Sequence, residues 1–164
     1  MLEITEVGGL RGVMSYNFQD QLSDPRQKEG CNEVKRILQE DGLEVVDVSE
    51  NKEYFEKGID LIVKWPDSIE TIDVKTDFQA HQTGNIPLEL VEVASMDGNF
   101  KVGWAYKDID YIYYYIYHTK QIKKLPLKKF RELAFSKFRK GYASYHQKPF
   151  PYFTLGLLIP LEEL

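Results

Sequence analysis

Asp60, Asp73 and Lys75 are the residues of this chain whose types and spacing are best suited to chemistry. Asp73 and Lys75 are two positions apart, so on a β-strand their side chains leave the same face of the sheet. Asp60 lies thirteen residues before Asp73 and opens an apolar, β-branched segment. Two carboxylates and one ammonium group that converge on a point predict a site for a hard metal ion with a charged group beside it.

Two predicted strands, residues 59–64 and 69–74, would position these side chains. The first segment is apolar, the second alternates apolar with polar residues, and the turn cluster Pro66-Asp67-Ser68 separates them. This pattern predicts a β-hairpin with a loop longer than the tightest kind. Asp73-Val74-Lys75 taken alone is typical of a solvated strand face, so the argument depends on what surrounds it.

A helix is predicted from Pro25 to Asp41. Ser23 and Asp24 are capping residues, Pro25 suits the first helical position, and Gly42 suits the position just after a helix. The helix would place Glu33 on or beside its inward face. Glu44 and Asp47 on the strand that follows are alternative acids with a less suitable spacing.

The remaining elements are read from composition and periodicity. We expect a loop at 78–85, strands at 43–48, 87–94, 109–117, 121–125 and 152–159, and a basic helix at 127–139. This order predicts an α/β fold with a central mixed β-sheet flanked by helices. With 164 residues the chain is expected to form a single domain, residues 1–164.

Charge is distributed unevenly along the chain. The net charge is −5, yet residues 118–149 hold ten Lys and Arg against Glu132 alone, while residues 1–117 hold 11 Lys and Arg against 23 Asp and Glu. Cys31 is the single cysteine, which excludes an internal disulfide, and no apolar run is long enough to cross a bilayer. The cytoplasm is therefore the expected compartment.

The charged residues occur in an order that resembles the PD-(D/E)xK, or restriction-endonuclease-like, nuclease superfamily. A helical glutamate, Glu33, precedes a strand, then Gly58-Ile59-Asp60 opens the next strand, and Asp73-Val74-Lys75 follows. Gly-Ile-Asp stands here where Pro-Asp often stands in the superfamily. The resemblance implies a restriction-endonuclease-like core and a metal-dependent endonuclease that hydrolyses DNA phosphodiester bonds, as in restriction, in junction resolution or in the repair and recombination systems of phages and bacteria.

The resemblance also implies roles for these residues. Asp60 and Asp73 would bind Mg²⁺ or Mn²⁺ directly, with the backbone carbonyl of Val74 as a third ligand. Lys75 would orient or deprotonate the attacking water, or offset charge in the transition state. Glu33 would be a fourth member, acting through water or holding a second ion.

Nucleic-acid contacts are expected in two places. The segment after Lys75 resembles small phage-like and bacterial members of the superfamily, in which Thr83 and Asn85 would hydrogen-bond a phosphate. The basic segment 118–149 would contact phosphates without reading sequence. Its candidate residues are Lys123, Lys124, Lys128, Lys129, Arg131, Lys137, Arg139 and Lys140.

Other functions fit the same sequence. The protein could be an inactive nucleic-acid-binding or interaction module on this fold, or a nuclease that cleaves RNA. The tyrosine run 111–117 is read first as a packed strand with one face half exposed, and otherwise as rings that stack on bases or join subunits. A homodimer is expected from the resemblance, because both strands of a duplex must be cut. The three histidines show no spacing typical of a metal site.

Overall fold

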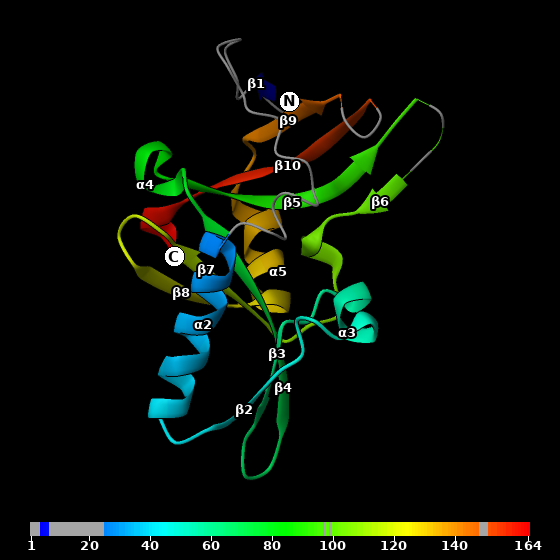
Figure 1. The fold of residues 1–164 in the computed structure, drawn as a ribbon. Helices are drawn as coiled ribbons and strands as arrows, with labels where there is room; N and C mark the ends of the chain where they lie inside the picture. The colour runs from blue at the N-terminus through cyan, green and yellow to red at the C-terminus, as the bar shows by residue number, and fades with distance from the viewer. Residues whose placement is uncertain (1–3, 7–24, 97, 99, 148–150) are drawn as a thin grey trace. The chain divides into compact units, whose positions relative to one another are not determined.

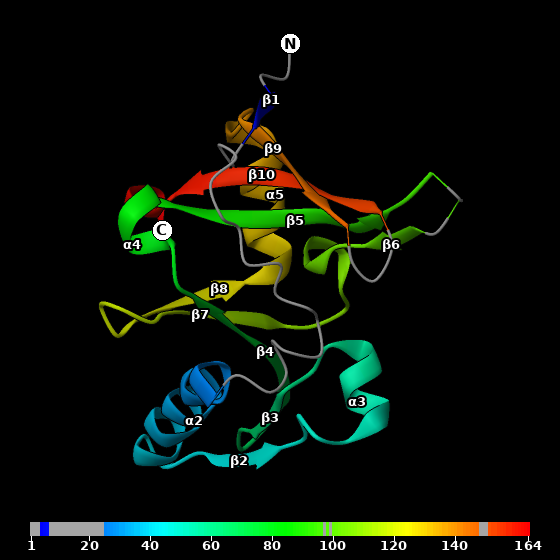
Figure 2. The same cartoon turned by 45° about the horizontal axis from the view of Figure 1, so that its top comes forward.

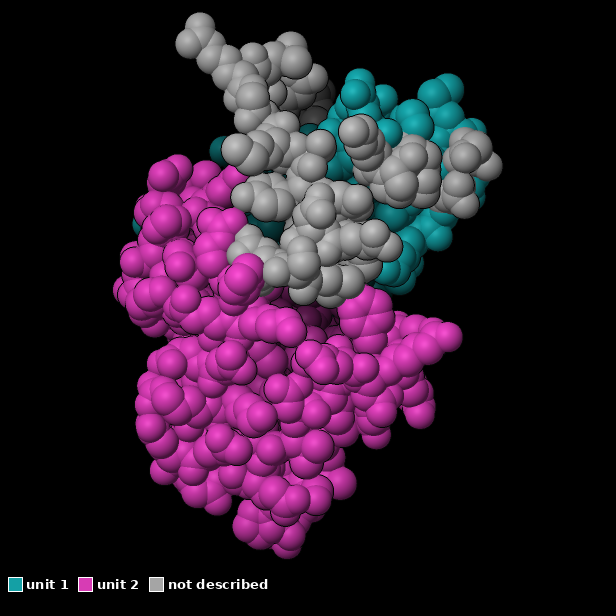
Figure 3. All heavy atoms as spheres, in the orientation of Figure 1, with its two compact units in different colours: residues 1–22, 84–106, 131–164 teal, residues 23–83, 107–130 magenta. Residues whose placement is uncertain are grey.

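The computed structural model describes residues 4–6, 25–96, 98, 100–147 and 151–164. The chain divides into two compact units (Figure 3). Unit 1 comprises residues 1–22, 84–106 and 131–164, and unit 2 comprises residues 23–83 and 107–130. Each unit has its own five-stranded sheet, sheet A in unit 1 and sheet B in unit 2. The single nuclease-like domain over residues 1–164 stays a prediction.

Sheet B is a mixed sheet built around the predicted hairpin. Its strands, in spatial order, are β2 (Glu44–Asp47), β3 (Leu61–Lys64), β4 (Ile69–Asp77), β7 (Tyr111–Ile116) and β8 (Gln121–Pro126). Neighbouring strands are antiparallel except β4 and β7, which run parallel. The hairpin is confirmed as β3–β4, and β4 continues to Asp77 instead of ending at Val74.

The helix α2 (Pro25–Glu40) packs against one face of sheet B (Figure 2). Its buried residues Val34 and Leu38 form a core cluster with Leu61 and Val63 of β3 and Ile72 of β4. These helix positions are four apart, so they lie one above the other on a single apolar stripe. The predicted helix is thus confirmed almost to the residue.

Gly30 allows α2 to approach the sheet closely. A Cβ atom at this position would collide with Thr76 Oγ1 and would lie 3.0 Å from Cδ1 of Tyr115. The residues that face α2 are therefore Ile72, Val74 and Thr76 on β4, which alternate with Asp73, Lys75 and Asp77 on the opposite face.

Two short helices complete unit 2. The helix α3 (Lys52–Lys57) is capped by Asn51, whose side chain accepts a hydrogen bond from the Glu53 amide at 3.0 Å, and it ends at Gly58. The helix α4 (Ala80–Thr83) lies within the segment expected to be a loop. Asp77 stabilises its start because Oδ1 accepts hydrogen bonds from the amides of Gln79 and Ala80, both at 2.6 Å.

The tyrosine strand β7 is packed on both faces. The rings of Tyr113, Tyr114 and Tyr115 are only 7%, 3% and 1% exposed. The expectation of a half-exposed face is wrong for these three residues, because α2 covers Tyr113 and Tyr115 on one face and Tyr114 is hydrogen-bonded to Asp77 on the other. Stacking of these three rings on nucleic-acid bases is therefore excluded.

Sheet A of unit 1 contains strands that are distant in sequence (Figure 1). In spatial order they are β1 (Ile4–Glu6), β9 (Gly141–His146), β10 (Tyr152–Pro160), β5 (Asn85–Ala94) and β6 (Phe100–Val102). Two 3₁₀ turns, Trp104–Tyr106 and Leu161–Glu163, belong to the same unit, and the helix α5 (Leu127–Lys137) begins in unit 2 and ends in unit 1. The strand β9 was not predicted, because Gly141 reads as the end of a helix; pairing with β10 and β1 makes it a strand.

One face of sheet A is apolar and exposed. The strand registers place Tyr145, Phe153, Ala94 and Phe100 in one row across the sheet, and Ala143, Leu155, Val91 and Val102 in the next. Tyr145 and Phe100 are 53% and 66% exposed, and the rings of Tyr145 and Phe153 lie 5.1 Å apart between centroids. We call these eight residues the apolar face of sheet A.

The predicted mixed α/β architecture, with mixed sheets and flanking helices, is confirmed. No helix in the described part of the chain is long and apolar enough to span a membrane.

Candidate active site

Asp60 and Asp73 face each other across the β3–β4 hairpin. Asp60 immediately precedes β3, whose first residue, Leu61, pairs with Ile72 of β4. The Asp60 amide donates to the Ile72 carbonyl at 2.9 Å, and the Asp60 carboxyl group is hydrogen-bonded to that of Asp73. Leu61 and Ile72 point toward α2, so the two aspartates point to the opposite face of sheet B, together with Lys75. The structure thus brings together three of the predicted site residues.

The environment of Asp60 favours its neutral form. Burial, followed by the negative charge of Asp73, raises the pKa of Asp60 to about 7. The Val74 amide donates to Asp60 Oδ2 at 2.8 Å and partly opposes this rise. Like charges directly opposite each other on two strands repel, so the proton on Asp60 is what allows the pair to lie together.

Asp73 is held in its charged form although it is only 3% exposed. Burial alone would raise its pKa, but two ammonium groups outweigh this effect and hold the pKa of Asp73 below its usual range. Lys75 Nζ lies 2.9 Å and Lys107 Nζ 3.3 Å from the same oxygen, Oδ2. A hydrogen bond between the two carboxyl groups completes the cluster.

The pair therefore has one carboxyl group that keeps its proton near neutral pH and one that does not. Functional sites often contain two adjacent acids whose pKa values are shifted in opposite directions. The protein then holds each group in a charge state that it would not have in water. An ordinary solvated strand face would not bury an aspartate between two lysines.

Lys107 is the member of this cluster that sequence reasoning missed. It lies in the segment between the 3₁₀ turn Trp104–Tyr106 and β7, 34 residues from Asp73. No local signal distinguishes this lysine from others in loops, since its place depends on the parallel pairing of β7 with β4.

The donor set fits a hard divalent cation. Mg²⁺ is usually held by one or two carboxylates, with water and substrate oxygens as the other ligands. In an extended strand the N–H and C=O of one residue point to the same side. Because the Val74 N–H points at Asp60, the Val74 carbonyl also points toward the β3 side of β4. Among the described residues no group of three or more Asp, Glu, His and Cys side chains is arranged to hold a metal, so the site rests on two carboxylates and a carbonyl.

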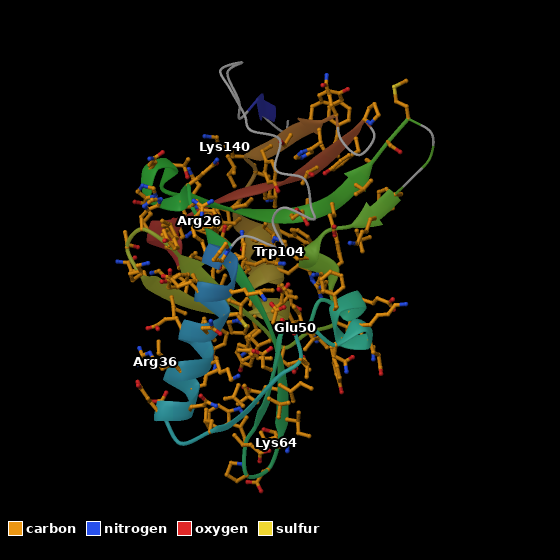
Figure 4. All side chains as sticks on the ribbon, in the orientation of Figure 1. Arg26, Arg36, Glu50, Lys64, Trp104 and Lys140 are labelled. Carbon is orange, nitrogen blue, oxygen red and sulfur yellow. The ribbon has the colours of Figure 1, made fainter. Side chains whose placement is uncertain are left out.

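Glu33 is not brought to this pair. Its carboxylate accepts hydrogen bonds from Arg36 Nη2 at 2.6 Å and Nε at 3.0 Å, an interaction that lowers the pKa of Glu33. Arg36 lies on the outer side of α2 and also contacts Glu40 (Figure 4). Since α2 packs on the face of sheet B opposite to Asp73, the predicted catalytic role of Glu33 has no support from its position.

The buried residues of α2, Gly30, Val34 and Leu38, form a stripe along the helix. Because each residue turns the helix by 100°, Cys31 lies on one side of this stripe and Glu33 on the other. Cys31 lines a pocket of about 400 Å³ with Lys28, Asn32 and Asp47. Burial, followed by the charges of Asp60 and Asp47, raises the pKa of the Cys31 thiol to about 12. A thiol with such a pKa stays neutral near pH 7.

The predicted phosphate contacts Thr83 and Asn85 lie at the two ends of a turn. Thr83 is the last residue of α4 and Asn85 the first of β5, and Gly84 between them has a φ of 67°, the left-handed conformation that suits glycine. Thr83 belongs to unit 2 and Asn85 to unit 1. Their contact with phosphate stays a prediction.

Several cations of the basic segment make contacts within the protein. Lys124 Nζ lies 4.2 Å from the centroid of the Tyr111 ring. Arg131 donates to the Ala105 carbonyl at 3.0 Å, and Lys137 forms an ion pair with Glu163. Arg139 donates to the Phe135 carbonyl at 2.7 Å, where it caps the end of α5.

The other cations of the segment are Lys123, which is half-buried on β8, and Lys128, Lys129 and Lys140, which are exposed. Within the predicted phosphate-binding set, Lys128, Lys129 and Lys140 are therefore the residues that extend into solvent. Binding of phosphate by any of them stays a prediction.

Two histidines that sequence spacing does not connect lie together in unit 2. The rings of His81 and His118 are 4.2 Å apart between centroids, and the His118 ring packs edge-on against Tyr117. Lys120 Nζ lies 4.0 Å from the centroid of the Tyr117 ring. This group occupies the β7–β8 turn and α4, and it has no ligand set for a metal among the described residues.

Comparison with known proteins gives one informative result. No family model matches the sequence, and no curated protein matches it. The solved structure of a bacterial homing endonuclease, I-Ssp6803I, is similar: the match covers 67% of this chain and 72% of that chain, with 12% sequence identity and a TM-score of 0.52. At this identity the likeness concerns the fold alone. The chain therefore has a mixed α/β fold similar to that of a nuclease.

Proposed function

We propose that this protein is a metal-dependent endonuclease that hydrolyses phosphodiester bonds of DNA. The observation that carries the proposal is the hydrogen-bonded pair of Asp60 and Asp73, with Lys75 2.9 Å from Asp73. The similarity to a homing endonuclease supports a nuclease fold, and the PD-(D/E)xK pattern of the sequence supports the assignment of the residues.

Asp60, Asp73 and the Val74 carbonyl are the groups that would hold Mg²⁺ or Mn²⁺. The ion would supply a positive charge for the phosphate oxygens and would make water a better nucleophile at neutral pH. Asp60 must lose its proton to become a ligand, so the site is expected to take up metal more readily above pH 7 than below it.

Lys75 assists the reaction from the same strand face as Asp73. Hydrolysis adds a water oxygen to phosphorus, breaks one P–O bond to a sugar oxygen, and transfers a proton from the water to a base. As an ammonium group beside Asp73, Lys75 can orient the attacking water and offset the negative charge that develops on the phosphate oxygens.

The basic segment 118–149 would add affinity for the phosphate backbone. The exposed Lys128, Lys129 and Lys140 are the best placed of its residues for this role, because they extend into solvent. Such contacts are electrostatic, so DNA affinity should fall steeply as salt is raised. A flat salt response would contradict this part of the proposal.

The same proposal includes a homodimer formed through the apolar face of sheet A. None of its eight residues is charged, and a twofold interface places the same patch against itself, so an apolar patch is complementary to its own copy. Each chain has one candidate metal site, and two copies would supply one site for each strand of a duplex.

Cleavage of mixed substrates tests the proposed function. The purified protein and its Lys75→Ala variant would be incubated with duplex DNA, single-stranded DNA, a four-way junction and RNA, each with Mg²⁺ or Mn²⁺. Cleavage of DNA by the parent and loss of cleavage in the variant is the expected result. Preferential cleavage of RNA would change the substrate, and DNA binding without cleavage would identify an inactive binding module.

A further inference from the structure

The second lysine at Asp73 has no place in the pattern that suggested the site. Lys107 Nζ lies 3.3 Å from Asp73 Oδ2, the oxygen that Lys75 Nζ contacts at 2.9 Å. A buried carboxylate can be neutralised by one ammonium group, so a second one on the same oxygen is more than the stability of Asp73 requires. Its position calls for another explanation.

The backbone at Gly58 provides the space that Lys107 occupies. Gly58 ends α3 with φ 71° and ψ 35°, a left-handed conformation that glycine adopts readily. A Cβ atom on Gly58 would collide with Lys107 Nζ and would lie 2.6 Å from Cε and 2.8 Å from Cδ. The outer half of the Lys107 side chain thus packs directly on the backbone of Gly58, two residues before Asp60.

The side chain of Lys107 is more enclosed than that of Lys75. It is 23% exposed, against 32% for Lys75 and 55% for the surface residue Lys57 in the neighbouring helix α3. This enclosure keeps the ammonium group in the neighbourhood of Asp73, while its flexible four-carbon stem still allows it to change its acceptor.

A divalent cation at Asp73 would not tolerate both ammonium groups on that oxygen. Mg²⁺ approaches its oxygen ligands to about 2.0–2.1 Å, and a positive charge near 3 Å from the same oxygen would be strongly repelled. Lys107 makes the longer of the two contacts, and it comes from a segment outside the hairpin, so it is the lysine that can move away while Lys75 stays on β4.

We propose that Lys107 is a phosphate-binding residue of the nuclease site, which leaves Asp73 when a divalent cation binds and donates hydrogen bonds to the phosphodiester that is cleaved. The inference rests on the proposed function. A phosphate oxygen is a charged acceptor of the same kind as the Asp73 carboxylate that the ammonium group leaves. The flexible side chain of Lys107 can reach it without a change in the backbone. Lys107 would then oppose the charge of the transition state from the side of α3.

Two variants at Lys107 and one control at Lys57 test this role. Lys107→Gln removes the charge at similar length, Lys107→Arg keeps it, and Lys57→Gln is the matched control, a lysine next to Gly58 whose ion pair with Glu53 is exposed. Single-turnover cleavage of duplex DNA in saturating Mg²⁺ would be compared with DNA affinity in Ca²⁺ and with Mg²⁺ affinity measured by calorimetry in the absence of DNA.

We expect Lys107→Gln to slow cleavage about 100-fold and Lys107→Arg to recover a large part of this loss. Mg²⁺ affinity should rise in Lys107→Gln, because a competitor for Asp73 is gone, while DNA affinity falls several-fold. A merely structural lysine would not give tighter metal binding together with slower cleavage. Lys57→Gln should match the parent in all three measurements.

Cleavage by Lys107→Gln at the parental rate would overturn the inference and leave the proposed function intact. A parent that cleaves no substrate would overturn the proposed function, and the DNA-affinity measurement would then decide the inference alone. Weaker DNA binding by Lys107→Gln than by Lys57→Gln would keep Lys107 as a phosphate-binding residue, and equal binding would overturn it.

Discussion

The two sheets of this protein place charge and apolar surface in opposite ways. In sheet B the apolar residues Leu61, Val63 and Ile72 are covered by α2, and a charged cluster around Asp73 is buried at a hairpin. In sheet A the apolar residues Tyr145, Phe153 and Phe100 are exposed on one face. Burying charge and exposing apolar surface both lower the stability of an isolated chain, so each points to a function outside folding. For sheet B the proposed function is hydrolysis of a charged substrate, and for sheet A it is contact with another apolar surface.

The largest expected effect is at Asp73. Asp73→Asn keeps the shape of the side chain but removes the charge that Lys75, Lys107 and the metal require. Cleavage should fall by at least about 1000-fold, whereas DNA affinity in Ca²⁺-free buffer should stay within a few-fold, because the backbone contacts lie elsewhere. Single-turnover kinetics and filter binding measure the two quantities. Cleavage by Asp73→Asn near the parental rate would remove sheet B from the proposed function.

The corresponding test of sheet A is a charge on its apolar face. Phe153→Lys places an ammonium group at the centre of a row of apolar residues and should raise the dissociation constant of a dimer about 100-fold or more. Phe55→Lys is the matched control, since Phe55 on α3 is 41% exposed and Phe153 is 43% exposed. Analytical ultracentrifugation would show a shift to monomer only for Phe153→Lys. A parent that is monomeric at all concentrations would contradict the dimer.

Local signals in the sequence predicted much of unit 2. Pro25 and Gly42 mark the ends of α2, and the turn at residues 66–68 fixes the β3–β4 hairpin, so the cross-strand meeting of Asp60 and Asp73 follows from residues close in sequence. The strand β9 could not be predicted in this way. Its residues 141–146 carry no strong strand pattern, and although its antiparallel partner β10 follows it directly along the chain, its parallel partner β1 comes from the other end of the sequence.

The same distinction explains where the structure departs from the predicted arrangement of the candidate site. Glu33 was chosen from the order of charged residues along the chain, but order does not say which face of the sheet a helix covers. Lys107 was missed because its contact with Asp73 depends on the parallel pairing of β4 with β7, which joins distant segments. Registers between neighbours in sequence are readable from turns, whereas pairings across long separations are set by the whole fold.

The protonation of Asp60 gives a smaller effect, measurable in stability. Its pKa is about 7 in the folded protein, against an ordinary value of 3.8, so its contribution to stability is complete below pH 4 and is lost as pH rises through 7. Asp73 is ionised in both states between pH 5 and 8, so it adds no slope in this window. Asp60→Asn imitates the neutral acid and should gain about 2 kcal/mol relative to the parent on going from pH 5 to pH 8.

Urea unfolding of the two proteins at both pH values measures this difference. Comparison with the parent removes the effect of other groups, among them His146, whose pKa is lowered by burial. A stability difference between Asp60→Asn and the parent that is the same at pH 5 and pH 8 would mean that Asp60 is ionised at both, and the pair would then not share a proton.

The smallest expected effect concerns Glu33. It tests whether a residue chosen from the order of the motif acts in cleavage although the structure places it away from Asp73. Glu33 bonds Arg36 at the side of α2, and this exposed ion pair should contribute less than about 1 kcal/mol. Glu33→Gln should therefore leave the cleavage rate within about twofold of the parent in Mg²⁺ and lower the stability only slightly. A loss of cleavage comparable to that of Asp73→Asn would instead require Glu33 to act at the metal, and α2 would have to move against sheet B when DNA binds.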